Sequence, residues 1–246
     1  MTGPVALVGA GEFLASMADF DLGLLAATGR RRPRVTIVPT AAYPSGEEAF
    51  LRVAANGLEH FRRLGADVEA VEVRDRGAAD DAASAQAIGE ADLVYFCGGR
   101  PGYLRRALHG SAVWLAAAEA HARGAILVGS AAGAMLLGER QVDLGIRLGW
   151  PLAWPTGLAV AEGIAILPAY DASPEPVMAL LAMLAPRGML VFGIDRETAV
   201  VGRDGAWEVH GSGRVTVWRG RRRERHRGGE SFRASEATLV EDFEAG

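Results

Sequence analysis

Short apolar runs, each ending in glycine or another turn residue, alternate with helical segments through the first half of the chain. They are PVALVGAG at 4–11, RVTIVPTAA at 34–42, DLVYFCGG at 92–99 and AILVGS at 125–130. Continuous apolar runs of this length are typical of strands buried on both faces, and their alternation with helices is typical of a parallel sheet. The pattern predicts an α/β fold, a three-layer α/β/α sandwich with a mostly parallel central sheet.

The segments between these runs have the spacing of amphipathic helices. In the segment 47–65, one face carries Phe50, Val53, Ala54, Leu58 and Phe61, and Gly65 is a suitable stop. The further predicted elements of this half are a strand at 67–73, a short helix at 80–91, and a helix at 102–124 broken at Gly110.

After residue 138 the alternation of apolar strands and helices becomes less regular. The segment 150–160, rich in Pro and Trp, predicts a loop, followed by a strand at 163–171 and a helix at 174–188. The later strands include a hairpin turning at Asp204-Gly205, which predicts a C-terminal β extension. We expect one domain over 1–218 and a charged, frayed, solvated tail over 219–246, with contact to anions or nucleic acid as the alternative for the tail.

Composition excludes several classes of protein. The chain has 246 residues, half of them hydrophobic, and a net charge of −4, which does not indicate a dedicated nucleic-acid binder. No apolar run reaches the length of a membrane span, and the first residues lack the pattern of a signal peptide. We therefore expect a cytoplasmic protein with no nucleic-acid or membrane partner.

Two residue counts narrow the chemistry. The sequence contains no lysine, which excludes a Walker A lysine, a pyridoxal Schiff base and a lysine general base. Its single cysteine, Cys97, excludes an intrachain disulfide and a multi-cysteine metal site. The G-A-G of residues 9–11 is not a dinucleotide fingerprint, because Leu14 stands where the third glycine belongs. No cofactor and no metal are expected.

The stretch ILVGSAAGAMLLG, residues 126–138, is the strongest candidate for an active site. A buried strand, a turn of small residues and a helix form the nucleophile elbow of hydrolases, where the centre of G-x-S-x-G attacks the substrate. Here Ala131 holds that centre and Ser130 precedes it. The turn is an active site without its nucleophile, a site whose nucleophile moved to Ser130, or a tight turn that only permits close packing.

The turn after the strand at 92–99 is the second candidate. Free backbone amides at the Gly98-Gly99 turn can supply one half of an oxyanion hole, and the N–H groups at the start of the helix after residue 131 can supply the other half. Cys97 is expected to be a core thiol, and Arg100 to lie on the surface or in a cationic pocket. Glu12 faces the pocket or caps the next helix. The five histidines, at positions 60, 109, 121, 210 and 226, are expected in packing or surface roles.

Taken together, these motifs resemble the S51 serine peptidases, the family of dipeptidase E and cyanophycinase. The resemblance covers residues 4–218 and includes GPVALVGAGE, the strand followed by GG, the G-S-A-A-G-A turn, ILPAYD, GIDRETAVVG and VHGSGRVTVW. It implies the class I glutamine amidotransferase-like sandwich and hydrolysis of small peptides through an acyl-serine. Members of the family often form homodimers.

The resemblance places alanine at both reactive positions. Ala131 stands at the nucleophile and Ala169, in ILPAYD, at the general-base histidine, while Asp143 is the candidate for the acid that orients that base. The resemblance also implies that the amides of Gly98, Gly99 and Ala132 bind the oxyanion. A methyl group neither attacks a carbonyl nor carries a proton, so the resemblance implies a protein without turnover. Deliberate substitution and relaxation in a natural pseudoenzyme both explain the pair.

Three functions remain open at this point. The first is an S51-type peptidase or amidohydrolase scaffold, inactive as written, that binds a small peptide or amino-acid amide. The second is a non-enzymatic binding or assembly protein on the same fold. The third, a glutamine amidotransferase-like domain that uses Cys97, ranks last because this cysteine follows the wrong strand. The expected geometry is a strained elbow at Ala131, with Ala169 within side-chain reach and Gly98 and Gly99 on the same rim.

Overall fold

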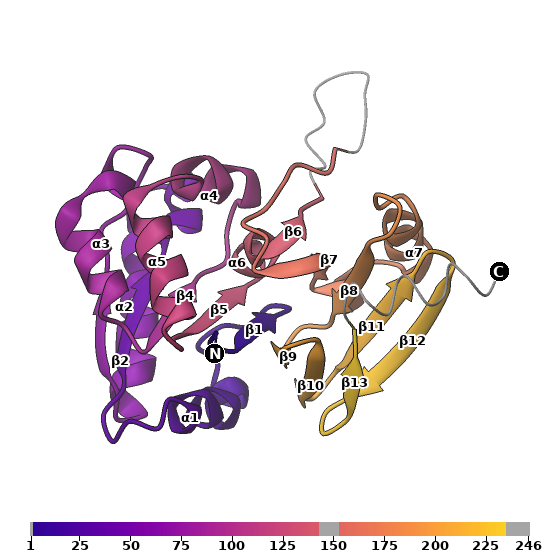
Figure 1. Cartoon of the computed structure of the whole chain (residues 1–246), viewed down its shortest axis with the longest axis horizontal. Helices are drawn as coiled ribbons and strands as arrows, with labels where there is room; N and C mark the ends of the chain where they lie inside the picture. Colours follow the sequence, from indigo (N-terminus) through magenta and orange to yellow (C-terminus); the bar gives the residue numbers. More distant parts are fainter. Residues whose placement is uncertain (1, 143–152, 235–246) are drawn as a thin grey trace.

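Two β-sheets organise the chain in the computed structural model, which describes residues 2–142 and 153–234 (Figure 1). Across the larger sheet the strands are β13 (Ser231–Arg233), β10 (Ala206–Gly211), β9 (Thr198–Arg203), β1 (Val5–Val8), β5 (Ile126–Ser130), β4 (Leu93–Phe96), β2 (Arg34–Val38) and β3 (Asp67–Ala70). Across the smaller sheet they are β12 (Arg222–Arg227), β11 (Arg214–Arg219), β8 (Leu190–Ile194), β7 (Ala161–Pro168) and β6 (Gly138–Arg140).

Helices cover both sheets. The α-helices are α1 (Ala18–Ala27), α2 (Glu47–Arg63), α3 (Ala82–Gly89), α4 (Pro101–Leu108), α5 (Ala112–Ala122), α6 (Ala132–Leu137) and α7 (Glu175–Met183). Short 3-10 helices are η1 (Ala15–Met17), η2 (Thr40–Ser45), η3 (Ala78–Asp80) and η4 (Tyr170–Ala172). Every helix among these described residues is too short or too polar to cross a membrane.

The first half of the chain forms the parallel part of the larger sheet. Strands β1, β5, β4, β2 and β3 pair in parallel, and β9 then pairs antiparallel with β1. The predicted α/β sandwich with parallel strands is confirmed. The second sheet was not predicted as a separate unit, because the sequence pattern after residue 138 does not show which strands pair.

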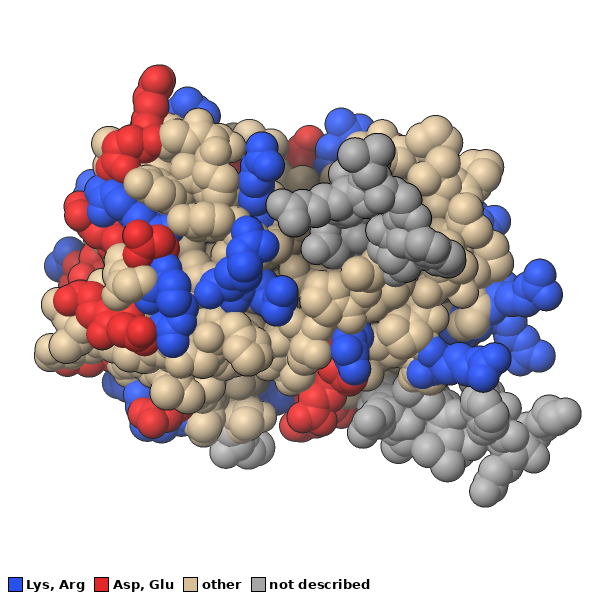
Figure 2. Space-filling model, turned by 90° about the horizontal axis from the view of Figure 1, so that it is seen from above, with Lys and Arg blue, Asp and Glu red and all other residues tan. Residues whose placement is uncertain are grey.

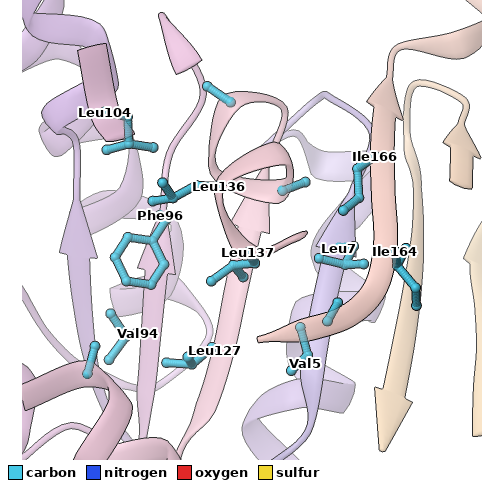
Figure 3. Close-up of a cluster of buried hydrophobic side chains, with 14 of the residues drawn as sticks. Val5, Leu7, Val94, Phe96, Leu104, Leu127, Leu136, Leu137, Ile164 and Ile166 are labelled. Atoms are coloured by element: carbon cyan, nitrogen blue, oxygen red, sulfur yellow. The ribbon is translucent and has the colours of Figure 1, made fainter. Parts of the chain in front are cut away.

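Alternating side chains of the buried strands supply two cores, one on each face of the larger sheet. In β1, Val5 and Leu7 join the cluster that includes α4, α5 and the smaller sheet (Figure 3). Ala6 and Val8 point the other way, into the cluster with α1 and α2. This alternation explains why the run is apolar at every position.

A third core lies between the smaller sheet and α7. Met178 of α7 packs there with Val191 of β8 and Trp218 of β11. The packing fixes the segment that leads from β7 through η4 to α7, and this segment contains ILPAYD.

Local signals in the sequence placed several turns correctly. The hairpin between β9 and β10 turns at Asp204 and Gly205, both with positive φ, 51° and 75°. The broken helix is confirmed as α4 and α5, separated at Gly110 with φ 68°. Helix α1 was not predicted; its apolar residues do not follow the one-faced spacing that identified α2.

The prediction of a frayed tail from residue 219 is wrong for the part that the structure describes. Strand β12 pairs antiparallel with β11, and β13 pairs with β10. Phe232 packs against the main core, and the His226 ring stacks on the Phe232 ring with 4.3 Å between the ring centroids. The indole N–H of Trp207 donates a hydrogen bond to the Ala234 carbonyl. A strand at the edge of a sheet can contain many charged residues, because their side chains reach solvent. Residues 235–246 lie outside the described part.

Candidate functional site

Ala131 occupies a strained turn between β5 and α6. Its backbone angles are φ 48° and ψ −105°, which residues with a side chain rarely adopt. A Cβ on Gly129 would lie 2.4 Å from the Gly133 carbonyl carbon, and a Cβ on Gly133 would lie 2.1 Å from the Phe96 oxygen. Glycine is therefore required on both sides of Ala131, and the turn has the tight strand-to-helix form of a nucleophile elbow.

Ser130, the residue before the elbow, is directed into the protein. Its side chain has no exposed surface, and its hydroxyl donates a hydrogen bond of 2.5 Å to Oε2 of Glu12. As the last residue of β5, it pairs with Val8 of β1. A buried hydroxyl that is already committed to a carboxylate is not placed to meet a substrate.

Glu12 joins the ends of three strands beneath this turn. While Oε2 accepts from Ser130 at the end of β5, Oε1 accepts from the backbone N–H of Gly98, after β4, at 2.9 Å. Glu12 itself follows β1. Among the alternatives from the sequence, the structure supports a carboxylate that faces the site rather than a helix cap.

The Gly98-Gly99 turn lies against the elbow. A Cβ on Gly98 would lie 3.3 Å from the Cβ of Ala131 and 2.7 Å from Oε1 of Glu12, so this position has no room for a side chain. Gly99 has φ 143°, and a Cβ there would lie 2.1 Å from the Ala41 oxygen. The N–H of Gly98, expected to bind an oxyanion, already donates to Glu12.

The other two expected oxyanion donors differ from Gly98. The amides of Gly99 and Ala132 form no hydrogen bond with another residue of the described part. For Ala132 this is expected, because it is the first residue of α6 and the first N–H groups of a helix have no partner within the helix. Arg100 donates its own N–H to the Ala41 carbonyl, and its side chain is exposed.

Ala169 lies beside the carboxyl end of β1. It adopts the left-handed conformation, with φ 48° and ψ 45°, and its N–H donates to the Gly9 carbonyl at 3.2 Å. The N–H of Ala131 donates to the Val8 carbonyl at 3.0 Å. The two alanines therefore flank consecutive residues at the carboxyl end of β1. Asp143, the predicted orienting acid, lies outside the described residues.

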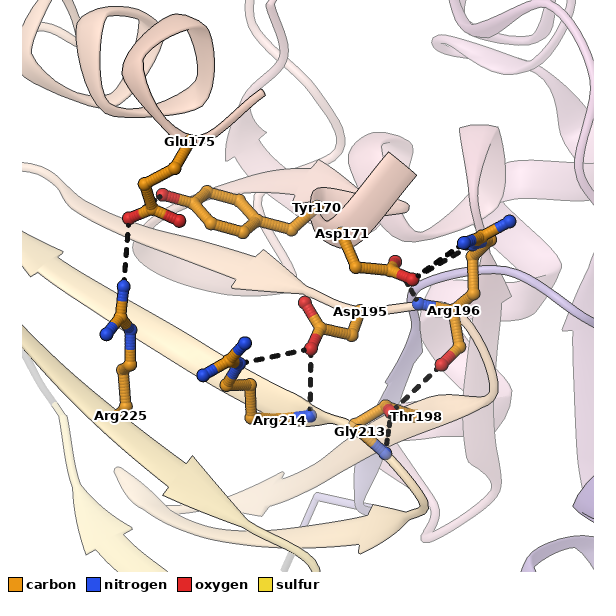
Figure 4. Close-up of polar contacts among 9 residues, drawn as sticks. All are labelled: Tyr170, Asp171, Glu175, Asp195, Arg196, Thr198, Gly213, Arg214 and Arg225. Carbon is orange, nitrogen blue, oxygen red and sulfur yellow. Dashed lines mark hydrogen bonds and ion pairs between the residues drawn. The ribbon is translucent and has the colours of Figure 1, made fainter. Parts of the chain in front are cut away.

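A polar network fixes the segment after Ala169 (Figure 4). Asp171 accepts the backbone N–H of Arg196 at 2.8 Å and its Nε at 3.0 Å. Burial acts to raise the pKa of Asp171, but the hydrogen bonds from Arg196 outweigh burial and lower this pKa below its ordinary value. Asp195, which accepts the Arg214 N–H, has its pKa raised, first by burial.

Sequence reasoning missed this network, although both partners stand in motifs that the chain shows. Asp171 follows Ala169 by two residues, and Arg196 lies in GIDRETAVVG. Only the pairing of β7 with β8 brings the two segments together. Tyr170 adds a further anchor, because its hydroxyl accepts from Nε1 of Trp218 at 3.1 Å.

Cys97 is buried beside the site but is not a nucleophile. Its side chain is wholly inaccessible, and burial raises the pKa of the thiol well above its ordinary value. Reactive cysteines need a lowered pKa and access to substrate. These properties agree with the expected core thiol and argue against the amidotransferase-like alternative.

His60 also lies in the interior, bonded to a carboxylate. Its Nε2 is 2.8 Å from Oδ2 of Asp21, and both side chains are almost fully buried. Burial is the main reason that the pKa of Asp21 is raised. The pair joins α1 to α2, which agrees with the packing role expected for this histidine.

Comparisons with known proteins give a family match and similar solved structures. The profile of peptidase family S51 matches residues 6–208. A peptidase from an acI-B1 Actinobacterium has a similar structure, with a TM-score of 0.85 and 27% identity over 95% of this chain and 98% of that one. A putative peptidase E protein from Listeria monocytogenes EGD-e shares the fold, with a TM-score of 0.62 and 16% identity over 86% of this chain and 100% of that one. A comparison with curated proteins gives no match.

Proposed function

We propose that this chain, which belongs to peptidase family S51, binds small peptides or amino-acid amides at the elbow but does not acylate a serine. The family and the similarity to a solved peptidase support a peptide ligand. The proposed absence of turnover depends on Ala131 and Ala169.

The observation that carries the proposal is the conformation of Ala131. The strained backbone, with φ 48° and ψ −105°, is of the kind that presents a nucleophile from an elbow, yet the side chain is a methyl group. Ala169, beside the same strand end, likewise carries no group that can take a proton. Acyl transfer needs both a nucleophile and a base, and loss of either reduces turnover by several orders of magnitude.

Ser130 does not replace the missing nucleophile in this proposal. Its hydroxyl is buried and donates to Glu12, so attack on a ligand would require both the turn and Glu12 to move. Glu12 also holds the Gly98 amide. The amides of Gly99 and Ala132 then remain as donors for a ligand carbonyl.

The test restores the missing pair. We expect Ala131→Ser with Ala169→His to react with a fluorophosphonate probe and to hydrolyse small peptides, including acidic dipeptides. Ala131→Ser alone should react far more slowly, because an unassisted hydroxyl is a weak nucleophile. The matched control is Ala169→His alone, which adds the imidazole without a nucleophile.

Binding is measured separately from turnover. Calorimetric titration of the unmodified chain with the same peptides should show saturable binding. If the chain binds none of them and the double variant remains inactive, the proposal is overturned in favour of a non-enzymatic assembly role.

A further inference from the structure

The arginines of the C-terminal strands form the strongest charge asymmetry in the chain. Residues 214–233 contain eight arginines and two glutamates, a net +6 in a chain whose total is −4, so the other residues together carry −10. Figure 2 shows arginines gathered at the end of the molecule where Figure 1 places β11 and β12. This segment was expected to fray, yet its charges lie on an ordered hairpin.

Strand β12 is an edge strand with backbone groups directed outward. It pairs with β11 on one side, and on its other side no strand of residues 2–142 or 153–234 pairs with it. Arg227 exchanges backbone and side-chain hydrogen bonds with Glu230 rather than with β11, which shows that its N–H and C=O point away from the sheet. Because the ladder alternates, Arg223 and Arg225 direct their backbone groups the same way, and no described residue bonds to them.

One carboxylate already occupies this face. Glu175, at the start of α7, lies between Arg223 and Arg225 and forms an ion pair with each, at 3.1 Å from Arg225. The Arg223 guanidinium also lies over the Trp218 ring, 5.4 Å from its centroid. The two side chains are thus fixed in positions that bind a carboxylate.

Further arginines around this edge are not committed to acids. Arg221, Arg222, Arg227 and Arg233 are exposed and form no ion pair with any described residue. Of the eight arginines, Arg223 and Arg225 share the carboxylate of Glu175. Arg214 forms an ion pair with Asp195, with 3.5 Å between Nε and Oδ2.

We propose that β12 is a docking edge for an extended acidic segment of another polypeptide. A strand added to β12 would bond to the outward backbone groups of Arg223 and Arg225. Its alternate side chains would recur about every 6.7 Å, as the arginines of β12 do. Carboxylates at these positions would face guanidinium groups across the strands, the favourable cross-strand pairing. This inference does not depend on the function proposed for the elbow.

A peptide fits this edge better than a nucleic acid. Single-stranded nucleic acids bind where exposed aromatic rings stack on the bases. Of the rings nearest to the edge, His226 is stacked on Phe232, and Trp218 is buried beneath Arg223. The outward N–H and C=O groups of an edge strand, in contrast, suit a peptide main chain.

The experiment measures binding of fluorescein-labelled hexaglutamate to the full chain by fluorescence anisotropy at low and moderate salt. We expect binding that weakens with salt, and at least tenfold weaker binding for R221Q/R222Q/R227Q. Glu175→Gln should bind at least threefold more tightly, since it frees Arg223 and Arg225. The matched control R52Q/R62Q/R63Q removes three exposed arginines from α2 and should change binding less than twofold.

Two further probes decide the mode and the class of partner. Hexaglutamate with alternate N-methylated residues keeps its charge but cannot pair as a strand, and we expect it to bind at least fivefold more weakly. Equal binding of the methylated peptide, no response to Glu175→Gln, or tighter binding of oligothymidylate than of hexaglutamate would overturn the proposal.

Discussion

Replacing Glu12 by alanine should destabilise the protein more than its partly exposed position suggests. The carboxylate accepts hydrogen bonds from two donors, the buried Ser130 hydroxyl at 2.5 Å and the Gly98 N–H at 2.9 Å. Hydrogen bonds to a charged group contribute about 1.5–3 kcal/mol each, and relief from burying the carboxylate offsets part of this. We expect a loss of about 2–4 kcal/mol in the free energy of unfolding.

Glu12→Gln separates the hydrogen bonds from the charge. The glutamine oxygen can accept from Gly98, and its amide can donate to the Ser130 oxygen, so we expect a loss of about 1 kcal/mol or less. The matched control is Glu197→Ala, because Glu197 is a neighbouring acid whose side chain forms no hydrogen bond with a described residue.

The assay is urea unfolding at neutral pH, followed by circular dichroism and by tryptophan fluorescence. In a thermal scan, the loss of about 2–4 kcal/mol for Glu12→Ala corresponds to roughly 4–16 °C for a chain of this size. In a double-mutant cycle, Glu12→Ala with Ser130→Ala should cost less than the sum of the single changes, because both changes remove the same hydrogen bond. Free energies of unfolding of Glu12→Ala and Glu197→Ala that agree within about 0.5 kcal/mol, the usual error in additivity, would show that Glu12 does not have this stabilising role.

Two further predictions concern the residues around the elbow. Asp171→Asn should lower stability at pH 7 by about 1 kcal/mol, because it weakens the bonds from Arg196. Since the pKa of Asp171 is lowered in the folded protein, its contribution is present above the unfolded pKa and is lost as pH falls through the folded pKa; urea unfolding should therefore show no difference between the two proteins at the acid end. Ala131→Gly should be neutral or stabilise by up to about 1 kcal/mol in the same assay, as glycine relieves the strain at φ 48°; a loss above 1 kcal/mol would show that Ala131 is not strained.

The parallel half of the fold could be predicted because its signals are local. Buried strands, helix spacing and glycine turns each lie within a few residues, and the Asp204-Gly205 hairpin follows from two residues alone. Strand order in the smaller sheet depends on contacts between distant segments, which periodicity does not specify. The charged tail misled the prediction because charge and disorder often occur together, whereas Phe232 anchors this tail in the core.

In the candidate site, too, the features set by local sequence could be predicted, and those set by contacts between distant segments could not. The G-S-A-A-G-A turn could be located from its small residues and the strand before it. The role of Glu12 could not, since its partners Gly98 and Ser130 lie 86 and 118 residues away. The bond between Asp171 and Arg196 likewise joins segments that only β7 and β8 bring together.

Intact-mass measurement of the unmodified protein after incubation with a fluorophosphonate probe shows whether the chain carries an activated serine. We expect a folded protein with unchanged mass, whereas Ala131→Ser with Ala169→His should gain one adduct at position 131. Stoichiometric labelling of the unmodified chain, mapped by peptide sequencing to Ser130, would contradict this expectation, because a hydroxyl buried against Glu12 would then be the nucleophile.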